Sequence, residues 1–304
     1  MRPNNLKPIS IAEKLLFCTI RIEASKTGGG TSTGTGFFYN HKVDDRHNLP
    51  LIITNKHVVS DASSGSFHVH LADNSDAKSP SGRFREFRLN NFNNLWIGHS
   101  DPATDLCAMP IQPLLTQVEQ AGEKIFSTPL STKELPSDAL LDELSALDEI
   151  VMPGYPIGIW DNKNNMPIIR RGVIASHPNL DFCGKSEFLA DIACFPGSSG
   201  SPVLLYNAGM YLKKGGGIQL GDRFALLGVN YAIPRYIETG SVSVDPIPTE
   251  LKGSAEYRVN THLAYIIKAE QISTLCAEAC KVLKIKSLAP PLTLNTQIED
   301  NTST

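Results

Sequence analysis

The chain has 304 residues, 41% of them hydrophobic, which is enough to bury one large core or two modest ones. Its formal net charge of −3 at pH 7 gives no reason to expect a nucleic-acid partner. The apolar run at 15–18 is far shorter than the roughly 20 residues that cross a membrane. The polar start at 1–10 does not look like a signal peptide, so we expect neither a membrane partner nor secretion.

Six cysteines in 304 residues are too sparse for a disulfide scaffold. Cys107 and Cys194 lie in apolar or site-forming runs, which favours free thiols. Cys276 and Cys280 are four residues apart on a predicted helix. Cysteines at this spacing are more often core residues than a pair of metal ligands. We therefore expect a reduced, cytoplasmic protein with no metal and no other cofactor.

Short strands separated by turn clusters dominate the first half of the chain. The stretch after 1–10 alternates like a strand, and Cys18–Glu23 alternates with a period of two. Thr27–Gly34 is predicted to be a Gly/Thr loop. Further strands are predicted at Gly36–Tyr39, Leu51–Asn55, Phe67–Leu71, Phe84–Leu89 and Asp105–Ile111. This pattern predicts a first β-barrel in residues 1–127.

Residues 128–148 are predicted to connect this barrel to a second one in 149–268. Leucines at 140, 141, 144 and 147 indicate a short helix in the connector. Strands of the second barrel are predicted at Glu149–Met152, Ile168–Ala175, Phe188–Ala193, Pro202–Leu205, Phe224–Val229 and Tyr257–Ile267. Gly215–Gly217 is predicted to be a hairpin tip. An amphipathic helix is expected at 269–288, followed by a disordered tail at 289–304.

The run Phe195–Pro202 places a serine among small residues. Gly197 can adopt backbone angles that other residues avoid, so its N–H can turn toward the N–H of Ser199. Two converging backbone donors form an oxyanion hole, and Ser199 beside them is the candidate nucleophile. Taken alone, the run is equally typical of a Gly/Ser/Pro loop between strands.

A serine nucleophile needs a base, and the base needs a third group to orient it. The apolar run Leu51–Val59 contains His57, and Asp105 leads directly into another apolar run. Carboxylates are mostly solvated, so an acid at the head of a buried strand is unusual. The chain order His57, Asp105, Ser199 is one of three known orders for a catalytic triad. The sequence therefore predicts that these three residues form one.

Five motifs strengthen this interpretation: Gly34–Phe38, Thr54–Val59, Asp105–Leu106, Gly197–Pro202 and Leu227–Ala232. In this order and spacing they resemble trypsin-like (chymotrypsin-fold) serine peptidases. The likeness is greatest to bacterial and HtrA-type members, here without a PDZ domain. The resemblance implies an all-β, chymotrypsin-like fold of two antiparallel six-stranded β-barrels with a C-terminal α-helix.

The resemblance also implies a substrate pocket with Ala193 at its base and with Cys194, Asn230, Tyr231 and Ala232 along its walls. A neutral residue at position 193 favours small or medium aliphatic side chains in the substrate. Asn230 is expected either to support Asp105 or to make a structural hydrogen bond of its strand. 

Two positions depart from the digestive enzymes of the family. Ser198 stands where they carry an aspartate that pairs with a newly cut N-terminus, so activation by cleavage is not expected. Ser201 stands where glycine is commonest.

Other polar residues are weaker candidates. His99 and Asp101 lie near Asp105 but are expected in a surface loop. His68 and His70 share a strand face without an evident third metal ligand. Asp181 and Asp191 are the acids that precede the nucleophile most closely; Asp191 either binds backbone or enters the pocket and attracts basic substrates.

The sequence thus predicts a serine endopeptidase that acts on polypeptides through an acyl-enzyme. The alternative is a catalytically silent protein that binds peptides or acts as a scaffold on the same fold. A protein activator is left open as a second partner. An esterase of the α/β-hydrolase type is disfavoured, because its chain order and its Gly-x-Ser-x-Gly elbow differ from those of this chain.

Overall fold

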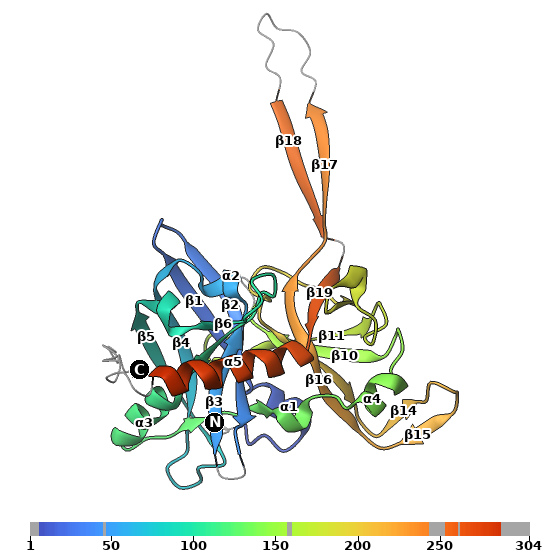
Figure 1. Cartoon of the computed structure of the whole chain (residues 1–304). Helices are drawn as coiled ribbons and strands as arrows, with labels where there is room; N and C mark the ends of the chain where they lie inside the picture. The colour runs from blue at the N-terminus through green and yellow to red at the C-terminus, as the bar shows by residue number, and fades with distance from the viewer. Residues whose placement is uncertain (1–5, 45–46, 157–159, 243–252, 261, 287–304) are drawn as a thin grey trace, which may run out of the picture.

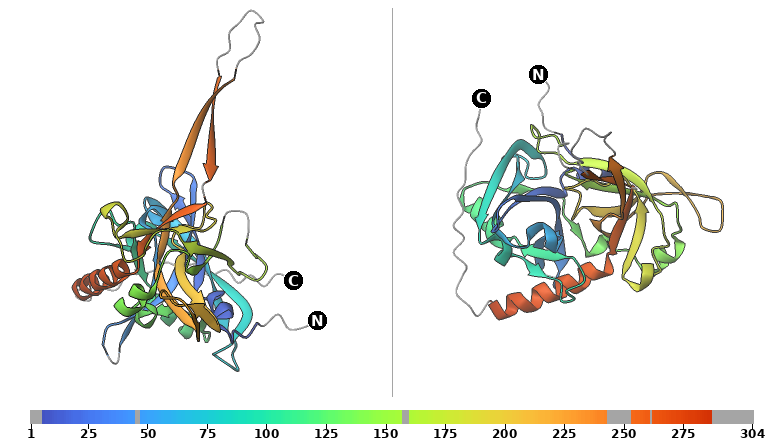
Figure 2. Two further views of the ribbon diagram at one scale, coloured as in Figure 1. Left: turned by 90° about the vertical axis from the view of Figure 1, so that its right-hand side faces the viewer. Right: turned by 90° about the horizontal axis from the view of Figure 1, so that it is seen from above.

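The computed structural model describes residues 6–44, 47–156, 160–242, 253–260 and 262–286. Two lobes of β structure lie side by side, and one long helix, α5 (Glu270–Lys286), begins beside the second lobe and runs across the first (Figures 1 and 2). The predicted tail at 289–304 and the last residues of the predicted helix lie outside the described residues.

The first lobe is a nine-stranded sheet. Seven strands follow the order β5-β4-β1-β2-β3-β7-β6, β8 pairs with β4, and β9 pairs with β2. The strands are β1 (Thr19–Lys26), β2 (Thr31–Lys42), β3 (Asn48–Thr54), β4 (Ala62–Ala72), β5 (Pro80–Asn90), β6 (Ile97–Gly98), β7 (Cys107–Pro110), β8 (Ile125–Phe126) and β9 (Leu130–Ser131). Between them lie α2 (Lys56–Val59), η1 (Phe92–Leu95) and α3 (Gln112–Gln120).

Two local predictions for this lobe were wrong. Residues 31–34 belong to β2 and pair with β1, because the threonines that alternate there suit a strand better than a loop. The stretch after 1–10 is α1 (Ile11–Leu15), a helix rather than a strand. Ser10 and Glu13 form a capping box: the Ser10 hydroxyl accepts from the Glu13 N–H, and the Glu13 carboxylate accepts from the Ser10 N–H.

The second lobe is a closed six-stranded barrel in the order β10-β11-β12-β19-β16-β13. Its strands are β10 (Glu149–Gly154), β11 (Ile168–Ile174), β12 (Glu187–Asp191), β13 (Pro202–Asn207), β16 (Arg223–Ala232) and β19 (Leu263–Lys268). The chain between the lobes carries η2 (Thr132–Glu134) and the expected short helix, α4 (Asp138–Glu143), and η3 (Phe182–Gly184) precedes β12. Leu147 lies beyond α4, exposed and with a positive φ, so it takes no part in the helix face.

Two hairpins extend from the barrel. The glycines at 216 and 217 have positive φ and close the hairpin of β14 (Met210–Leu212) and β15 (Ile218–Leu220), as predicted. The second hairpin, β17 (Arg235–Val242) and β18 (Gly253–Asn260), projects from the body of the molecule (Figure 1). The single strand expected at Tyr257–Ile267 is therefore two strands, one in this hairpin and one in the barrel.

Apolar clusters explain why the lobes stay together. One cluster fills the first lobe around Ile22, Phe67 and Phe87, and another fills the barrel around Ile150 and Phe188. A third cluster joins apolar residues of both lobes to α5; it includes Leu15, Phe37, Ile53, Leu204, Leu226, Ile272 and Leu275. Burying such side chains stabilises the fold by roughly 1.5–3 kcal/mol each. The helix therefore holds the two lobes in a fixed relation.

The expected all-β, chymotrypsin-like class with a C-terminal helix is confirmed. The barrel has the six antiparallel strands that were expected, whereas the first lobe has nine strands, and β2 and β9 run parallel. The additional strands β6, β8 and β9 have only two residues each, too few for a periodic sequence pattern. No helix in the described residues is long and apolar enough to span a membrane.

Candidate active site

A cleft of about 550 Å³ contains the three residues that the sequence singles out as a triad. His57 comes from α2, Asp105 from the segment just before β7, and Ser199 from the turn between β12 and β13. The other lining residues come from β2, from the same turn and from the end of β16: Thr33, Cys194, Phe195, Pro196, Gly197, Asn230, Tyr231, Ala232 and Ile233. Segments far apart in the sequence thus meet at one surface.

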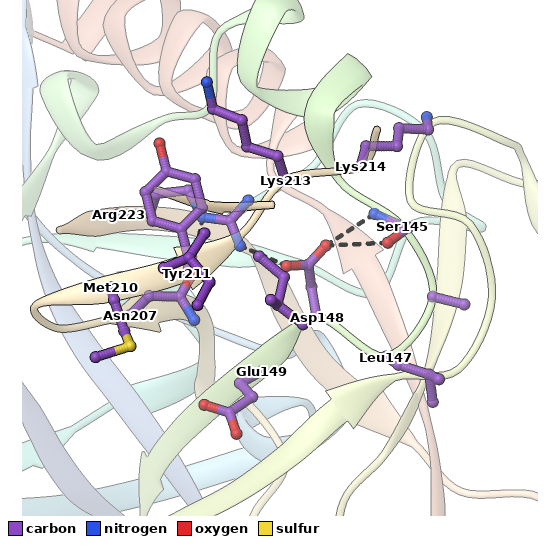
Figure 3. A pocket seen from close by; sticks show the side chains of 13 residues that line it. Ser145, Leu147, Asp148, Glu149, Asn207, Met210, Tyr211, Lys213, Lys214 and Arg223 are labelled. Atoms are coloured by element: carbon purple, nitrogen blue, oxygen red, sulfur yellow. Dashed lines mark hydrogen bonds and ion pairs between the residues drawn. The ribbon is translucent and has the colours of Figure 1, made fainter. Parts of the chain in front are cut away.

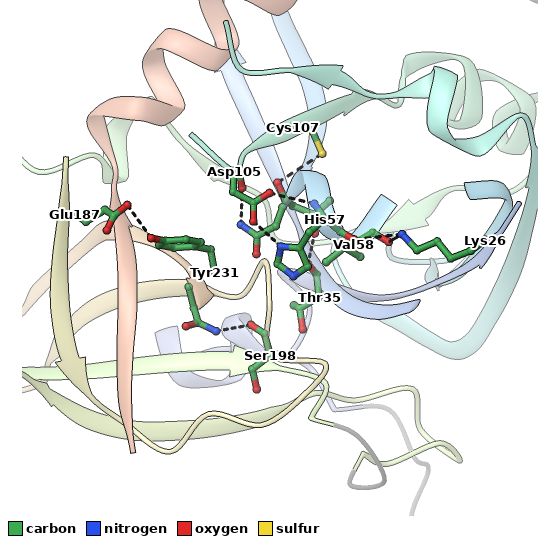
Figure 4. Close-up of polar contacts among 12 residues, drawn as sticks. Lys26, Thr35, His57, Val58, Asp105, Cys107, Glu187, Ser198 and Tyr231 are labelled. Carbon is green, nitrogen blue, oxygen red and sulfur yellow. Dashed lines mark hydrogen bonds and ion pairs between the residues drawn. The ribbon is translucent and has the colours of Figure 1, made fainter. Parts of the chain in front are cut away.

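His57 and Asp105 make two contacts with each other (Figure 4). Nδ1 of His57 lies 2.5 Å from Oδ2 of Asp105, and the backbone N–H of His57 donates to Oδ1 at 3.1 Å. The carboxylate therefore fixes both the ring and the backbone of the histidine. Asn55, fully buried, donates from its side chain to the backbone carbonyl of Asp105 at 2.8 Å and so joins the two segments.

Lys26 supports the short helix that carries His57. Its Nζ donates to the carbonyl oxygens of His57 and Val58 at 3.2 and 3.3 Å, and to that of Ser60 as well. An ammonium group stabilises the carbonyl end of a helix, where these oxygens have no helical partner. Burial lowers the pKa of Lys26, although Asp61 opposes this shift.

Close packing places the helix of His57 directly against β2. A Cβ added to Gly34 would lie 2.6 Å from Val58, so only glycine lets the two elements approach this closely. This contact gives a physical reason for the glycine in the Gly34–Phe38 motif.

The turn around Ser199 has the backbone that its glycines predict. Gly197 has a φ of +94° and Gly200 a φ of +85°, which residues with a Cβ rarely adopt. A Cβ on Gly200 would lie only 2.0 Å from the carbonyl oxygen of Thr35 in the first lobe. Within the described part of the chain, neither the N–H of Gly197 nor that of Ser199 donates a hydrogen bond. Both donors are therefore free to bind an anionic oxygen in the cleft.

Thr35 is a supporting residue that the sequence did not reveal. Its buried hydroxyl donates to the carbonyl of Gly197 at 2.8 Å and accepts from the N–H of Tyr155 at 3.0 Å. Its backbone N–H donates to the carbonyl of Ser199 at 2.8 Å. The one sequence signal for Thr35 was its position between Gly34 and Gly36. Its partners could not be read from that signal, because they lie more than a hundred residues away in the chain.

Asn230 has a different partner from the one proposed for it beside Asp105. Its side-chain Nδ2 donates to the carbonyl of Ser198 at 2.9 Å, and its Oδ1 lies 3.7 Å from the Cys194 thiol. Of the two expectations for Asn230, the structural hydrogen bond therefore describes its side chain, and support of Asp105 does not. Ser198 itself is 2% exposed and carries no charge that an N-terminal ammonium could bind.

The specificity wall differs in part from the expected one. Cys194, Tyr231 and Ala232 line the cleft, but Ala193 is not among the lining residues. The Tyr231 hydroxyl donates to Glu187 at 2.8 Å, so this side chain is held at the edge of the cleft. Burial raises the pKa of the Cys194 thiol to about 12. Asp191 is exposed on β12 and is not among the lining residues either.

The weaker candidates have other partners. His99 is buried rather than in a surface loop, and its Nδ1 accepts from the N–H of Asp101. His70 is buried, and its Nε2 lies 3.0 Å from the carbonyl oxygen of Asn165. Asp181 pairs with Lys268 at 2.6 Å. Across the described residues, no three His, Cys, Asp or Glu side chains gather as a metal site would require.

A second hollow, of about 520 Å³, lies between the β14–β15 hairpin and the turn before β10 (Figure 3). The buried pair of Arg223 and Asp148, 2.5 Å apart, lies at its side, and Tyr211 stacks on the guanidinium group. The charges of Arg223 and Asp148 are therefore paired with each other, and the hollow contains none of the triad candidates. The cleft at Ser199 is therefore the candidate active site.

All six cysteines lie in the described residues, and none of them forms a disulfide, as the composition predicts.

Comparisons with known proteins found similar structures and one matching family. The chain is similar to the active form of the Rv3671c protease from M. tuberculosis, with 13% identity, a TM-score of 0.43, and coverage of 88% of this chain and 82% of that one. It is similar to the inactivated protease paralogue S-I1 of the scabies mite, with 11% identity, a TM-score of 0.45, and coverage of 88% and 96%. No curated protein matches the sequence significantly. The family model described as "Trypsin-like peptidase domain" matches residues 34–210, more than half of the chain. The chain therefore belongs to the trypsin-like peptidase family.

Proposed function

We propose that this peptidase is a serine endopeptidase with His57 as base, Asp105 as its orienting acid and Ser199 as nucleophile. The observation that carries the proposal is the cleft in which these three residues lie with two free backbone N–H groups. The contact of Asp105 with Nδ1 of His57 supports it further, because it leaves Nε2 of the ring to accept a proton.

In the proposed reaction, the Ser199 hydroxyl attacks the carbonyl carbon of a peptide bond while His57 takes the hydroxyl proton. The oxygen of the tetrahedral intermediate is stabilised by the N–H groups of Gly197 and Ser199. His57 then gives the proton to the leaving amine, and the acyl group stays on Ser199 as an ester. Water attacks this ester with His57 again as base, and Ser199 recovers its proton.

Among the described residues, no hydrogen bond joins the Ser199 hydroxyl to the His57 ring, although both line the cleft. Catalytic hydrogen bonds often tighten only when substrate binds. The proposal therefore expects the bond to form in the complex with a peptide.

The test is covalent labelling of the purified chain with a fluorophosphonate, which reacts only with an activated serine, together with hydrolysis of a peptide library. We expect labelling at Ser199 and cleavage of peptides. Ser199→Ala should abolish both, since loss of the nucleophile of such a triad lowers kcat by roughly 10⁶-fold. Full hydrolysis by Ser199→Ala would overturn the proposal. Failure of the wild-type chain to label or cleave would favour the silent peptide-binding protein.

A further inference from the structure

The three carbonyl groups of the nucleophile turn are all held by hydrogen bonds. The carbonyls of Gly197 and Ser199 accept from Thr35, from its hydroxyl and its N–H respectively, at 2.8 Å each. The carbonyl of Ser198 accepts from the side chain of Asn230 at 2.9 Å and, within the turn, from the N–H of Ser201 at 3.1 Å. Thr35 belongs to β2 in the first lobe and Asn230 to β16 in the barrel. The turn is thus fixed from both lobes.

The bond from Asn230, together with the one from the Ser201 N–H to the same carbonyl, fixes the direction of an oxyanion donor. In a trans peptide group the C=O and N–H point to opposite sides of the chain. The Ser198 carbonyl points toward the buried Asn230 amide, so the N–H of Ser199 points the other way. Ser199 lines the cleft, and its N–H is one of the two donors that remain free.

The Asn230 side chain is well placed for this task. It is 3% exposed, and both ends of its amide are occupied, Nδ2 by Ser198 and Oδ1 by the Cys194 thiol. Its backbone makes two more bonds to the turn: its carbonyl accepts from Gly200 at 2.8 Å, and its N–H donates to Ser201 at 3.0 Å. A change of the side chain therefore leaves the strand and the turn paired.

We infer that Asn230 is a positioning residue of the oxyanion hole, and that with Thr35 it keeps the turn ready for catalysis in the intact chain. This inference rests on the proposed function. The amide of Asn230 acts on the same turn that a new N-terminus and an aspartate fix in the digestive enzymes, where this chain has the uncharged Ser198. Neither N-terminal cleavage nor a protein activator is then needed to form the hole.

The test compares Asn230→Leu and Asn230→Asp with the wild-type full-length chain. Leucine has a similar volume but no donor, and aspartate places an acceptor against the Ser198 carbonyl. Complete loss of one oxyanion donor lowers kcat by roughly 10²–10³-fold. In these variants the Ser199 N–H is displaced but still present, so we expect kcat to fall by roughly 10- to 100-fold. KM should change less than about twofold, because the side chain faces the interior. Affinity for a peptide boronate, whose tetrahedral adduct uses the same donors, should fall with kcat.

Ser176→Ala serves as the matched control. It removes a 2.8 Å bond from the N–H of Leu189 to a half-buried hydroxyl in the same barrel, away from the cleft. Its melting temperature should fall while kcat stays unchanged. If Asn230→Leu lowered the melting temperature but left kcat unchanged, as the control should, the inference would be wrong. It would also be wrong if Asn230→Leu raised KM alone, since Asn230 would then act as a substrate wall.

Variants of Thr35 provide a second test, which does not depend on the folding of the Asn230 variants. Thr35→Ser keeps the hydroxyl, so it should keep the boronate affinity, whereas Thr35→Val should lower it together with kcat. Equal affinities of the two variants would overturn the role of the Thr35 hydroxyl. Labelling of the wild-type chain by the fluorophosphonate is measured first. Its absence would refute the proposed function, whereas labelling with unaffected Asn230 variants would refute only this inference.

Discussion

One carboxylate, that of Asp105, holds both the ring and the backbone of His57. Oδ2 lies 2.5 Å from Nδ1 of the ring, and Oδ1 accepts from the backbone N–H at 3.1 Å. A ring held in this way cannot rotate without losing its partner. The tautomer with the proton on Nδ1 is the one that leaves Nε2 free as a base.

Asp105→Asn tests this relationship. An amide that presents its N–H to Nδ1 favours the opposite tautomer, so kcat should fall by roughly 10⁴-fold with the fold retained. Peptide hydrolysis and the melting temperature are the measurements. Asp101→Asn is the control, because Asp101 lies four residues earlier and, among the described residues, its carboxylate accepts bonds only within its own loop, from Ala103 and Thr104. Lys56 donates to its backbone carbonyl, which the variant keeps. A similar loss in both variants would contradict the role given to Asp105.

Lys26→Met should weaken the helix that carries His57. The ammonium group donates to three carbonyl oxygens at the end of this helix, and bonds that involve a charged group contribute about 1.5–3 kcal/mol each when they are shielded from water. Lys26 is partly exposed, so in the variant water replaces some of these hydrogen bonds. We therefore expect the free energy of unfolding to fall by about 1–2 kcal/mol. We also expect a lower kcat. Urea denaturation measures the first effect. Lys26→Arg, which keeps the charge, should lie closer to the wild type.

The cleft thiol should be inert at neutral pH. Burial raises the pKa of Cys194 to about 12, so the reactive thiolate is scarce there until the solution is strongly alkaline. Iodoacetamide at neutral pH should modify the exposed Cys183 and leave both Cys194 and peptidase activity unchanged. Mass spectrometry of the labelled chain gives the sites. Inhibition that follows modification of Cys194 would contradict the burial of this thiol.

The sequence predicted the parts of the site that depend on local pattern. His57 and Asp105 stand in or before apolar runs, and the glycines at 197 and 200 take the positive φ that their residue type permits. These features can be recognised because each depends on neighbours in the chain. The same holds for the barrel strands, each of which is five or more residues long and so offers a local pattern.

The supporting contacts could not be predicted in this way. The Thr35 hydroxyl reaches Gly197 across 162 positions, and nothing near residue 35 specifies that distance. The partner of Asn230 stayed open between Asp105 and a structural hydrogen bond for the same reason: position along β16 does not determine which way its amide points. The helix α1 was missed because an alternating pattern was given more weight than the capping box of Ser10 and Glu13.

The chain should need no cleavage near its N-terminus. Ser198 is buried, and its N–H already donates to the carbonyl of Phe195 at 2.9 Å, so a new ammonium group would find no carboxylate there. Removal of residues 1–9 keeps Ser10, the cap of α1, and should leave kcat/KM within about twofold, since changes outside such features have small effects. A large rise in activity on trimming would contradict this prediction.

The cleft should prefer small or medium aliphatic side chains before the cut bond. Cys194, Ala232 and Ile233 give it a neutral wall, and Asp105 is the one acid among the described lining residues. Asp105 is already bonded to His57, so a substrate Arg or Lys would enter without a partner, at a cost of several kcal/mol.

Cleavage of a peptide library should therefore concentrate after Ala, Val and Leu. Discrimination among these should be modest, because one methylene is worth roughly 1–3 kcal/mol. Asp191→Asn is the informative variant, since Asp191 lies on β12, which leads toward the turn, and is exposed outside the lining. Its cleavage profile should match that of the wild type. Dominant cleavage after Arg or Lys that disappears in Asp191→Asn would show that Asp191 enters the cleft and supplies the charge.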